Sequence, residues 1–376
     1  MFYLTTGIQM MLHNRVRLLL TMLGVAIAFF LVAAQSGLLI GWINTCTAIV
    51  RHAEADLWVM AEKAPAFDYG TAIPRQCLSQ ARSVPGVVWS EGLFIGWNIW
   101  HRQDGKRVNV QLVGLDKRCL GGPWQMQEGE VSCVLQPNTV IVDDLYRSAL
   151  GFERVGQEFE MIGRHARIGG VSSGVRTLSA CPFVFTSLKQ AIQYDQRYRD
   201  DEITYVMARC AADADPVAVQ HEMQRRMPRM EVLTTAEFAT RTALYWMLET
   251  GVGITVVVTA CLGLAVSIGI TSQTLYAITQ EHLSNYATLL ALGFRRGTLV
   301  RMVLVQSLLL GLAGVLGGSA LFFPAAMLSA RTPIPLETTP LVYAVLIIVS
   351  LASCGVAALM SVRTIFHIDP VKVFHS

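Results

Sequence analysis

Four long intervals of the chain contain no charged residue, and they constrain its fold more than any other feature. No Asp, Glu, Lys or Arg occurs in residues 18–50, 250–280, 302–330 and 338–362. A helix needs about 20 apolar residues to cross the hydrocarbon core of a membrane, and each interval exceeds that length. Charged residues make up only 15% of the chain, well below the share in soluble proteins. We therefore predict a membrane protein with four transmembrane α-helices, at residues 18–42, 249–278, 302–328 and 341–362.

The first apolar interval has a second interpretation, because Arg15 and Arg17 precede it as they would precede the apolar core of a cleaved signal peptide. Such a core spans about 7–15 residues, and this interval is much longer. We expect the first helix to stay attached as a membrane span.

The Lys and Arg residues in the short flanks predict the orientation of the spans. Seven of them lie in the N-terminal arm (1–17), the segment 279–301 and the tail 363–376: Arg15, Arg17, Arg295, Arg296, Arg301, Arg363 and Lys372. The loop 329–340 between the last two spans has only Arg331. We expect the arm, the segment and the tail to be cytoplasmic. The loop and the long segment 43–248 then lie outside.

The external segment 43–248 has the composition of a soluble domain, with 23 acidic and 22 basic residues, and is long enough to bury its own core. Short alternating or β-rich runs predict strands at Val108–Val113, Glu158–Ile162 and Ile203–Met207. Helix starts are indicated by Asp215 before Pro216 and by the capping box formed by Thr234 and Glu237. We predict a large α+β domain inserted between the first and second transmembrane helices.

Six of the eight cysteines lie in the external segment, at Cys46, Cys77, Cys119, Cys133, Cys181 and Cys210. Disulfides persist outside the cytoplasm, and six cysteines permit fifteen pairings. Free cysteines are also common as small buried side chains, so both interpretations stay open. No Cys or His spacing matches a zinc site, and we expect no metal on this chain.

The motifs that resemble catalytic sites are weak. Ser172 lies in a G-x-S-x-G pattern, but the residues after it look extended rather than helical, which favours a loop. The zinc-protease pattern that begins at His221 has Arg225 where a second His is required. We interpret Asp144 as the N-cap of a short helix that ends at Gly151. The chain also lacks a G-x-x-x-x-G-K-[ST] phosphate loop, so we expect another polypeptide to bind any ATP that is used.

The predicted spans carry few polar groups. Side chains that could line a path or join helices are Gln35, Ser267, Gln273 and Gln306. Hydrogen bonds between helices are the commoner role of such residues. Gly314 and Gly318 are spaced to allow close approach of two helix backbones, which predicts a tight bundle or a dimer.

The cytoplasmic segment 279–301 is amphipathic, because Leu283, Ala287, Leu290 and Phe294 fall on one face of a helix. On these residues alone, two interpretations stay open. The segment lies in the lipid headgroups with its arginines reaching phosphate, or it binds a partner on the cytoplasmic side.

A family resemblance favours the partner. The motifs Thr250-Gly-Val-Gly, Gln273-Thr-Leu-Tyr, Glu281-His-Leu, Asn285-Tyr-Ala-Thr-Leu and Ala291-Leu-Gly resemble the DevC-type permeases of the FtsX/MacB-like ABC transporter superfamily. Asn14-Arg15, Leu20–Phe29, Ala55–Trp58 and Ile368-Asp-Pro370 are also similar to that group, so the resemblance covers nearly the whole chain. Leu290 departs from the lysine of the DevC type, which bears on the subgroup and not on the superfamily.

The resemblance implies a homodimeric permease of the bacterial inner membrane, with its large domain in the periplasm. A separate ABC ATPase would carry ATP and Mg, so that this chain has no catalytic or cofactor-binding residue. An adaptor protein and a TolC-like outer-membrane channel would complete an exporter of lipid-like or amphipathic cargo, in contact with membrane lipids and with no nucleic-acid partner. The coupling segment would dock on the ATPase through Glu281, His282, Tyr286, Leu289, Leu292, Gly293, Phe294, Arg295 and Arg296. A rival is an FtsX-like regulator of a cell-wall hydrolase that transports nothing.

Overall fold

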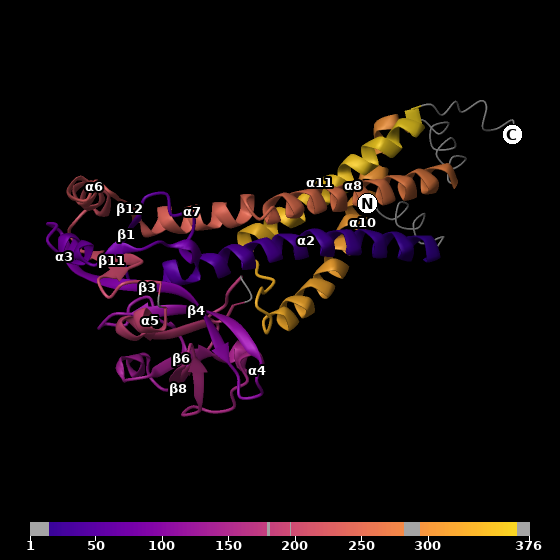
Figure 1. The fold of residues 1–376 in the computed structure, drawn as a ribbon. Coiled ribbons are helices and arrows are strands. Elements are labelled where there is room, and N and C mark those ends of the chain that lie inside the picture. Colours follow the sequence, from indigo (N-terminus) through magenta and orange to yellow (C-terminus); the bar gives the residue numbers. More distant parts are fainter. Residues whose placement is uncertain (1–14, 179–180, 196, 282–293, 367–376) are drawn as a thin grey trace. The chain divides into compact units, whose positions relative to one another are not determined.

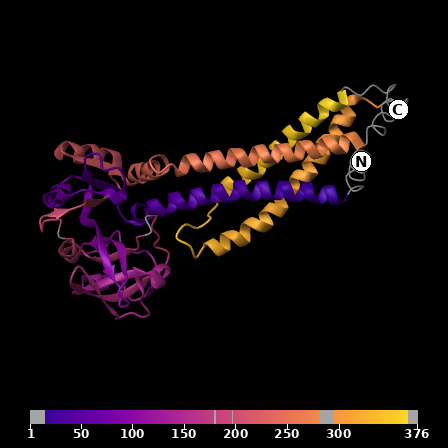
Figure 2. The same ribbon diagram turned by 45° about the vertical axis from the view of Figure 1, so that its right-hand side comes forward.

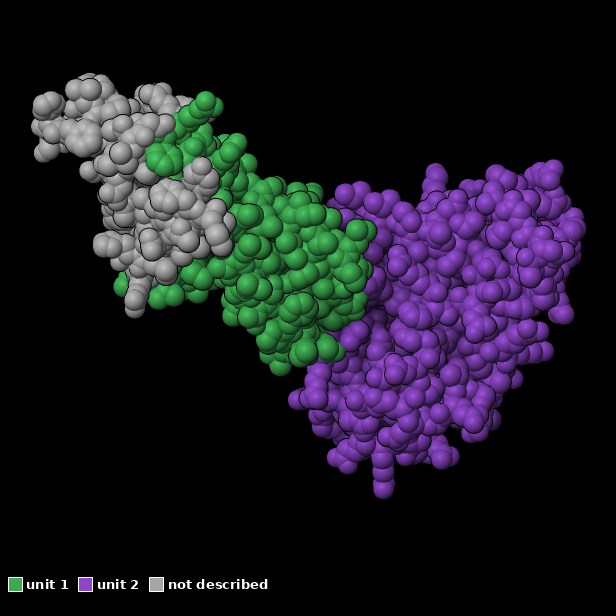
Figure 3. All heavy atoms as spheres, turned by 180° about the vertical axis from the view of Figure 1, so that it is seen from behind, with its two compact units in different colours: residues 1–41, 253–330, 335–376 green, residues 42–252, 331–334 purple. Residues whose placement is uncertain are grey.

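The computed structural model describes residues 15–178, 181–195, 197–281 and 294–366. The chain forms two compact units, shown in green and purple in Figure 3. Unit 1 comprises residues 1–41, 253–330 and 335–376, and unit 2 comprises residues 42–252 and 331–334. Each unit has its own hydrophobic core.

Long apolar helices build unit 1 (Figures 1 and 2). They are α2 (Arg15–His52), whose last residues belong to unit 2, α8 (Val252–Glu281), α10 (Arg296–Ser329) and α11 (Pro340–Phe366). Within the described residues, four stretches are long and apolar enough to cross a membrane: Leu18–His52, Val252–Gln273, Gly297–Ser329 and Pro340–Met360. The prediction of four apolar helices is confirmed. The helices do not have the bounds of the expected spans, and the boundaries of the spans against a membrane stay a prediction.

Glycines let α10 pack closely on α2. A Cβ atom at Gly318 would lie 2.7 Å from the carbonyl oxygen of Ala26, and one at Gly314 would collide with Val25. Because no side chain larger than hydrogen fits there, the backbones of the two helices approach closely. The expected close approach through Gly314 and Gly318 is confirmed inside one chain, while a dimer stays a prediction.

Unit 2 is built on a mixed sheet, which has ten strands among the described residues. The spatial order is β12 (Met230–Thr234), β1 (Leu57–Ala61), β11 (Tyr205–Cys210), β3 (Val87–His101), β4 (Arg107–Leu115), β9 (Phe183–Ser187), β6 (Thr139–Asp143), β8 (Arg164–Ser172) and β5 (Met126–Glu128). The tenth strand, β7 (Glu158–Met161), pairs with β3 and β8. β4 and β9 are parallel, as are β6 and β8, and the other pairs are antiparallel. A separate small sheet joins β2 (Ile73–Pro74) to β10 (Glu202–Ile203).

Helices cover both faces of this sheet. They are α3 (Gln76–Arg82), α4 (Arg147–Leu150), α5 (Leu188–Tyr194), α6 (Pro216–Arg226) and α7 (Thr235–Leu248), with short 3-10 helices η1 (Phe67–Tyr69), η2 (Val131–Leu135) and η3 (Asp144–Tyr146). Alternate residues of β1 point to opposite faces. Leu57 and Val59 pack in the core that holds α3, α5 and α6, whereas Trp58 and Met60 pack with Phe238 of α7. The predicted α+β class is confirmed.

The predicted strands are present, with two changes at their ends. Val108–Val113 lies inside β4, and β7 stops at Met161 because Ile162 has a φ of +45°, which a strand does not accommodate. The run from Ile203 is divided between β10 and β11 at Thr204, whose hydroxyl accepts a hydrogen bond from the Ile95 amide at 3.0 Å.

Two predicted helix starts, at Asp215 and at Thr234, agree with the structure, and a third, at Asp144, does not. Asp215 caps α6 with Pro216 at its first position, as predicted. The prediction for Asp144 is wrong, because Asp143 is the cap and its Oδ1 accepts from the Leu145 amide at 3.0 Å. A cap needs an extended backbone, which Asp143 has as the last residue of β6, whereas Asp144 is already helical. The helix ends at Gly151, as predicted.

All eight cysteines lie in the described part of the chain, and all are free thiols. Cys46, Cys77 and Cys210 are buried, which agrees with the interpretation of these residues as small core side chains.

Candidate functional site: the attachment of α7 and α2 to the sheet

α7 begins at a fixed point on the sheet. Thr234 ends β12 and caps α7, and Thr234 and Glu237 form the predicted capping box. The Thr234 hydroxyl accepts from the Glu237 amide at 3.2 Å, and Glu237 Oε2 accepts from the Thr234 amide at 2.8 Å. The next residue ties the helix to its neighbours, since the Thr235 hydroxyl donates to the Ala55 carbonyl at 2.6 Å and accepts from Trp58 Nε1 at 3.1 Å. The predicted capping box is confirmed.

One face of α7 is buried at helical spacing, through Phe238, Ala239, Thr242 and Trp246. Phe238 lies in an aromatic cluster with Trp58, Phe67 and Tyr205, at ring-centroid distances of 5.4, 6.3 and 5.5 Å. Buried aromatic pairs contribute about 0.5–1.5 kcal/mol each beyond the area they bury. The cluster therefore fixes the first turn of α7 against β1, η1 and β11.

A buried carboxylate holds the far end of α7. Trp246 Nε1 donates to Asp68 Oδ2 at 3.0 Å, and the Thr242 hydroxyl accepts from the Phe67 amide at 3.3 Å. Asp68 is 8% exposed, and burial raises the pKa of its carboxyl from 3.8 to about 6 even though the bond from Trp246 favours the charged form. At neutral pH the helix is thus bound to a buried, charged acceptor.

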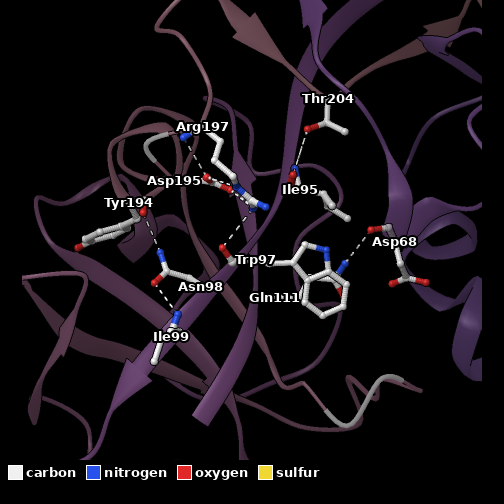
Figure 4. A network of polar contacts seen from close by, with 10 residues as sticks. All are labelled: Asp68, Ile95, Trp97, Asn98, Ile99, Gln111, Tyr194, Asp195, Arg197 and Thr204. Atoms are coloured by element: carbon white, nitrogen blue, oxygen red, sulfur yellow. Dashed lines mark hydrogen bonds and ion pairs between the residues drawn. The ribbon is translucent and has the colours of Figure 1, made fainter. Parts of the chain in front are cut away.

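Two side chains of the sheet hold the backbone of the segment that carries Asp68. Gln111 of β4, which is fully buried, donates from Nε2 to the Asp68 carbonyl at 3.4 Å, as Figure 4 shows. Its Oε1 has no hydrogen-bond partner among the described residues. The Tyr205 hydroxyl donates to the Phe67 carbonyl at 2.8 Å. These bonds fix η1, and with it the acceptor that holds Trp246.

The last residues of α2 attach to the same place in unit 2. Trp42 packs edge-on against Trp246, with ring centroids 6.4 Å apart, and Cys46 belongs to the same small core as Trp246. Ile49 and Val50 enter the core that contains Trp58. α2 continues directly into unit 1, and α7 is followed by α8. Both α2 and α7 contact one aromatic cluster around Asp68.

α7 continues into α8 through three residues: Glu249, Thr250 and Gly251. Gly251 has a φ of +72°, a left-handed conformation that ends one helix and allows another to begin. The Thr250 hydroxyl donates to the Trp246 carbonyl, which satisfies one of the last acceptors of α7. The connection is short and partly hydrogen-bonded rather than a long loop.

The rest of the network in Figure 4 is structural. Asn98 of β3 donates to the Tyr194 carbonyl at 2.8 Å, and Arg197 Nη2 binds the buried Asp195 carboxylate at 2.6 Å. The bond from Asn98 joins the end of α5 to β3, and Arg197 also donates from Nη2 to the Trp97 carbonyl of β3 at 3.4 Å.

Ser172, the centre of the G-x-S-x-G pattern, is the last residue of β8 and fully buried, so the expected loop is wrong for the first half of the motif. It donates to Asp143 Oδ2 at 2.9 Å, and the same oxygen accepts from the Val175 amide at 2.9 Å. A bend follows it rather than the helix that a nucleophile elbow needs. Ser172 and Asp143 therefore hold this bend at the end of β6. Among the described residues, no group of His, Cys, Asp and Glu is suited to hold a metal.

Most of the predicted coupling residues lie outside the described residues, namely His282, Tyr286, Leu289, Leu292 and Gly293. Glu281 is the last residue of α8 and Arg296 the first of α10. Arg295 is exposed and extended immediately before α10, and Phe294 is half-buried. Docking of this segment stays a prediction.

The polar residues of the spans lie on three helices: Gln35 on α2, Ser267 and Gln273 on α8, and Gln306 on α10. Ser267 and Gln306 are buried, Gln35 is half-buried and Gln273 is exposed. Only Ser267 of these lines the small enclosed cavity between Phe29, Leu264 and Leu346.

The cluster around Asp68 was not predicted. Asp68 and Trp246 are 178 residues apart, and neither is part of a recognisable local motif. The one available signal was the capping box, which placed the start of α7.

A set of four apolar helices with a large α+β unit defines a multi-pass membrane protein. Residues 18–226 match the family of MacB-like periplasmic core domains, and residues 257–370 match the FtsX-like permease C-terminal family. The chain therefore belongs to the FtsX/MacB superfamily of ABC-type permeases, and this membership implies an ABC ATPase as its partner.

Three solved structures are similar to this chain over about half of its length. The extracellular domain of the ABC-type transporter YknZ from Gram-positive bacteria is 10% identical, with a TM-score of 0.37, and is covered over 98% of its length and 48% of this chain. The periplasmic region of MacB from Actinobacillus actinomycetemcomitans is 9% identical with a TM-score of 0.38, covering 51% of this chain and 94% of that one. A domain of a putative permease from Porphyromonas gingivalis is 14% identical with a TM-score of 0.34, covering 51% of this chain and 98% of that one. The search of curated proteins found no match.

Proposed function

We propose that this chain is the permease subunit of an ABC exporter, and that it carries movement from a cytoplasmic ATPase into unit 2. The observation that supports this most is the attachment of α2 and α7 around Asp68. α2 is a single helix of 38 residues, and only three residues separate α7 from α8. Because helices are stiff and the links are short, a shift of the spans is passed to the sheet rather than absorbed by a linker.

The finer parts of the proposal rest on the resemblance to DevC-type permeases. In it, two copies of the chain assemble in the bacterial inner membrane with both termini in the cytoplasm and unit 2 in the periplasm. ATP and Mg bind the ATPase subunit. A periplasmic adaptor and a TolC-like channel receive lipid-like or amphipathic cargo. The alternative is an FtsX-like regulator that uses the same movement to activate a cell-wall hydrolase, and an adaptor gene or a hydrolase gene beside the ATPase gene would discriminate the two.

The coupling segment gives the first test. Replacement of Leu292 or Phe294 with Asp places a charge where the proposal needs an apolar anchor, and buried anchors dominate the affinity of an interface. We expect each variant to insert into the membrane and to lose most of the ATPase in co-purification. A matched control is Val16→Asp, which places the same charge at an exposed apolar residue of the predicted cytoplasmic arm, outside the apolar stretch that begins at Leu18. If the Leu292 and Phe294 variants insert and keep the ATPase, the docking assignment is wrong.

A further inference from the structure

The outward face of α7 borders an open groove of about 770 Å³. Pockets for small molecules commonly measure about 300–1,000 Å³. Its walls come from α7, from the start of β12 and from the turn after β1, and include Lys63, Pro65, Glu231, Arg241, Leu244 and Leu248. All of them belong to unit 2.

The groove changes from polar to apolar along α7. Glu237, Arg241, Leu244 and Leu248 follow one another on the same face of the helix. Leu244 and Leu248 are 48% and 61% exposed and lie one turn apart on α7. The two leucines lie at the end of the groove that leads into α8, where the exposed Glu249 also lines it.

The polar end presents both signs of charge. Arg241 Nη1 donates to Glu231 Oε2 at 2.7 Å, and Glu231 also accepts from the Lys63 amide at 3.3 Å. The Lys63 ammonium is exposed and forms no ion pair within the described part of the chain. Glu237 lies on the same wall. This combination suits a zwitterionic group whose anion meets Lys63 and whose cation meets a glutamate.

Chain connectivity places the apolar end next to the membrane. Leu248 ends α7, and Val252 begins a candidate membrane span four residues later. Consecutive Cα atoms are at most about 3.8 Å apart, so the Cα atoms of the two residues are within about 15 Å of each other in any arrangement of the units. A molecule in the groove is therefore within reach of the edge of the bilayer.

We propose that this groove binds one zwitterionic phospholipid from the adjacent leaflet. Its acyl chains lie along Leu244 and Leu248, and its headgroup lies between Lys63 and Glu237. This inference rests on the proposed function only for the membrane placement of α8, and it adds the place where an amphipathic molecule contacts unit 2.

The test uses the full-length chain in vesicles of phosphatidylethanolamine and phosphatidylglycerol, without ATPase or nucleotide. The vesicles contain phosphatidylethanolamine with a photoreactive group in the acyl chain, and labelled peptides are mapped by mass spectrometry. We expect labelling of residues 240–248 in addition to the spans. Leu244→Gln and Leu248→Gln should each reduce the α7 labelling about fivefold, because each removes a contact worth on the order of one buried methylene or more.

Two matched controls have equally exposed apolar side chains elsewhere in unit 2. Val217 is 49% exposed and Val88 is 61% exposed, and Val217→Gln and Val88→Gln should leave the α7 labelling unchanged. Labelling of the spans without α7 overturns the proposal. So does labelling that the leucine variants do not reduce, or a chemical cross-link between the α7 helices of two copies, which makes a second chain the occupant.

The result of the labelling test can be distinguished from the result of the test of the proposed function. If α7 is not labelled but the ATPase still co-purifies, only the lipid site is wrong. If α7 is labelled and the ATPase does not bind the chain, the lipid site stands and the exporter assignment fails.

Discussion

Asp68 is the buried acceptor that binds Trp246 of α7. Its carboxylate is buried, accepts from Trp246, and has no cationic partner among the ion pairs of the described residues. A buried charge without a counter-ion is costly and is tolerated only when hydrogen bonds satisfy it. The groups that face it are Trp246 on α7, Gln111 on β4, Cys46 on α2, and Tyr205 and Tyr69.

This environment predicts a pH dependence of stability. Because the pKa of Asp68 is raised from 3.8 to about 6 in the folded protein, its contribution is fully present below about pH 4 and is lost as the pH rises through 6. Asp68→Asn keeps an acceptor for Trp246 and removes the charge. We expect the variant to gain up to about 3 kcal/mol of unfolding free energy relative to the native protein between pH 4 and pH 8.

Urea unfolding of the full-length protein in detergent, at several pH values, measures this difference. Asp200→Asn is the control, since Asp200 is an exposed acid of the same unit. Parallel pH profiles for the native protein and Asp68→Asn would rule out the buried charge at this position.

At the scale of elements, α7 shows how local and distant signals combine. Its start was predictable because the capping box is a local pattern: a Thr, then a Glu three residues later. Its attachment was not, because Phe238 and Trp246 find their partners in Trp58, Phe67 and Asp68, which are at least 170 residues away in the sequence. The same contrast explains the strands, whose runs were visible while the mixed order of the sheet was not.

The capping box gives a prediction for α7. Thr234→Ala removes the acceptor of the Glu237 amide and should reduce the unfolding free energy by about 1 kcal/mol. The control is Thr240→Ala in the same helix, whose hydroxyl bonds only within the helix, to the Ala236 carbonyl, and whose loss should change little. Thermal unfolding followed by circular dichroism compares the two. Equal midpoints for both variants would show that the cap adds no stability.

The contact between α10 and α2 gives another prediction about stability. Gly314→Ala places a methyl group against Val25, and we expect a loss of about 1–3 kcal/mol from overpacking. Gly269→Ala is the matched control, because a Cβ there meets nothing within 4 Å. Thermal stability in detergent distinguishes the variants. A Gly314→Ala protein as stable as Gly269→Ala would mean that the helices are not in close contact.

At the scale of the whole molecule, the charge-free intervals were enough to predict four apolar helices, because lipid imposes a length and a composition that sequence shows directly. The α+β class also followed from composition and short runs. The predicted coupling site cannot be compared with the structure, since residues 282–293 lie outside the described part of the chain. The structure adds that one continuous helix, α2, and one three-residue connection, between α7 and α8, lead to the same buried cluster.

The central claim is that movement passes from the ATPase through the connection between α7 and α8 into unit 2. Hydrogen exchange of the complex of this chain with its ATPase, with and without vanadate-trapped nucleotide, measures it most directly. We predict that trapping changes exchange in residues 230–248. An eight-residue Gly-Ser insertion after Gly251 interrupts one of the two helical connections and leaves α2 continuous, so it should reduce that change while ATP hydrolysis continues. The same insertion after Gly105, in an open turn, should leave both the exchange change and ATP hydrolysis intact. Exchange that does not respond to nucleotide, or a response that the insertion after Gly251 does not reduce, would contradict the claim.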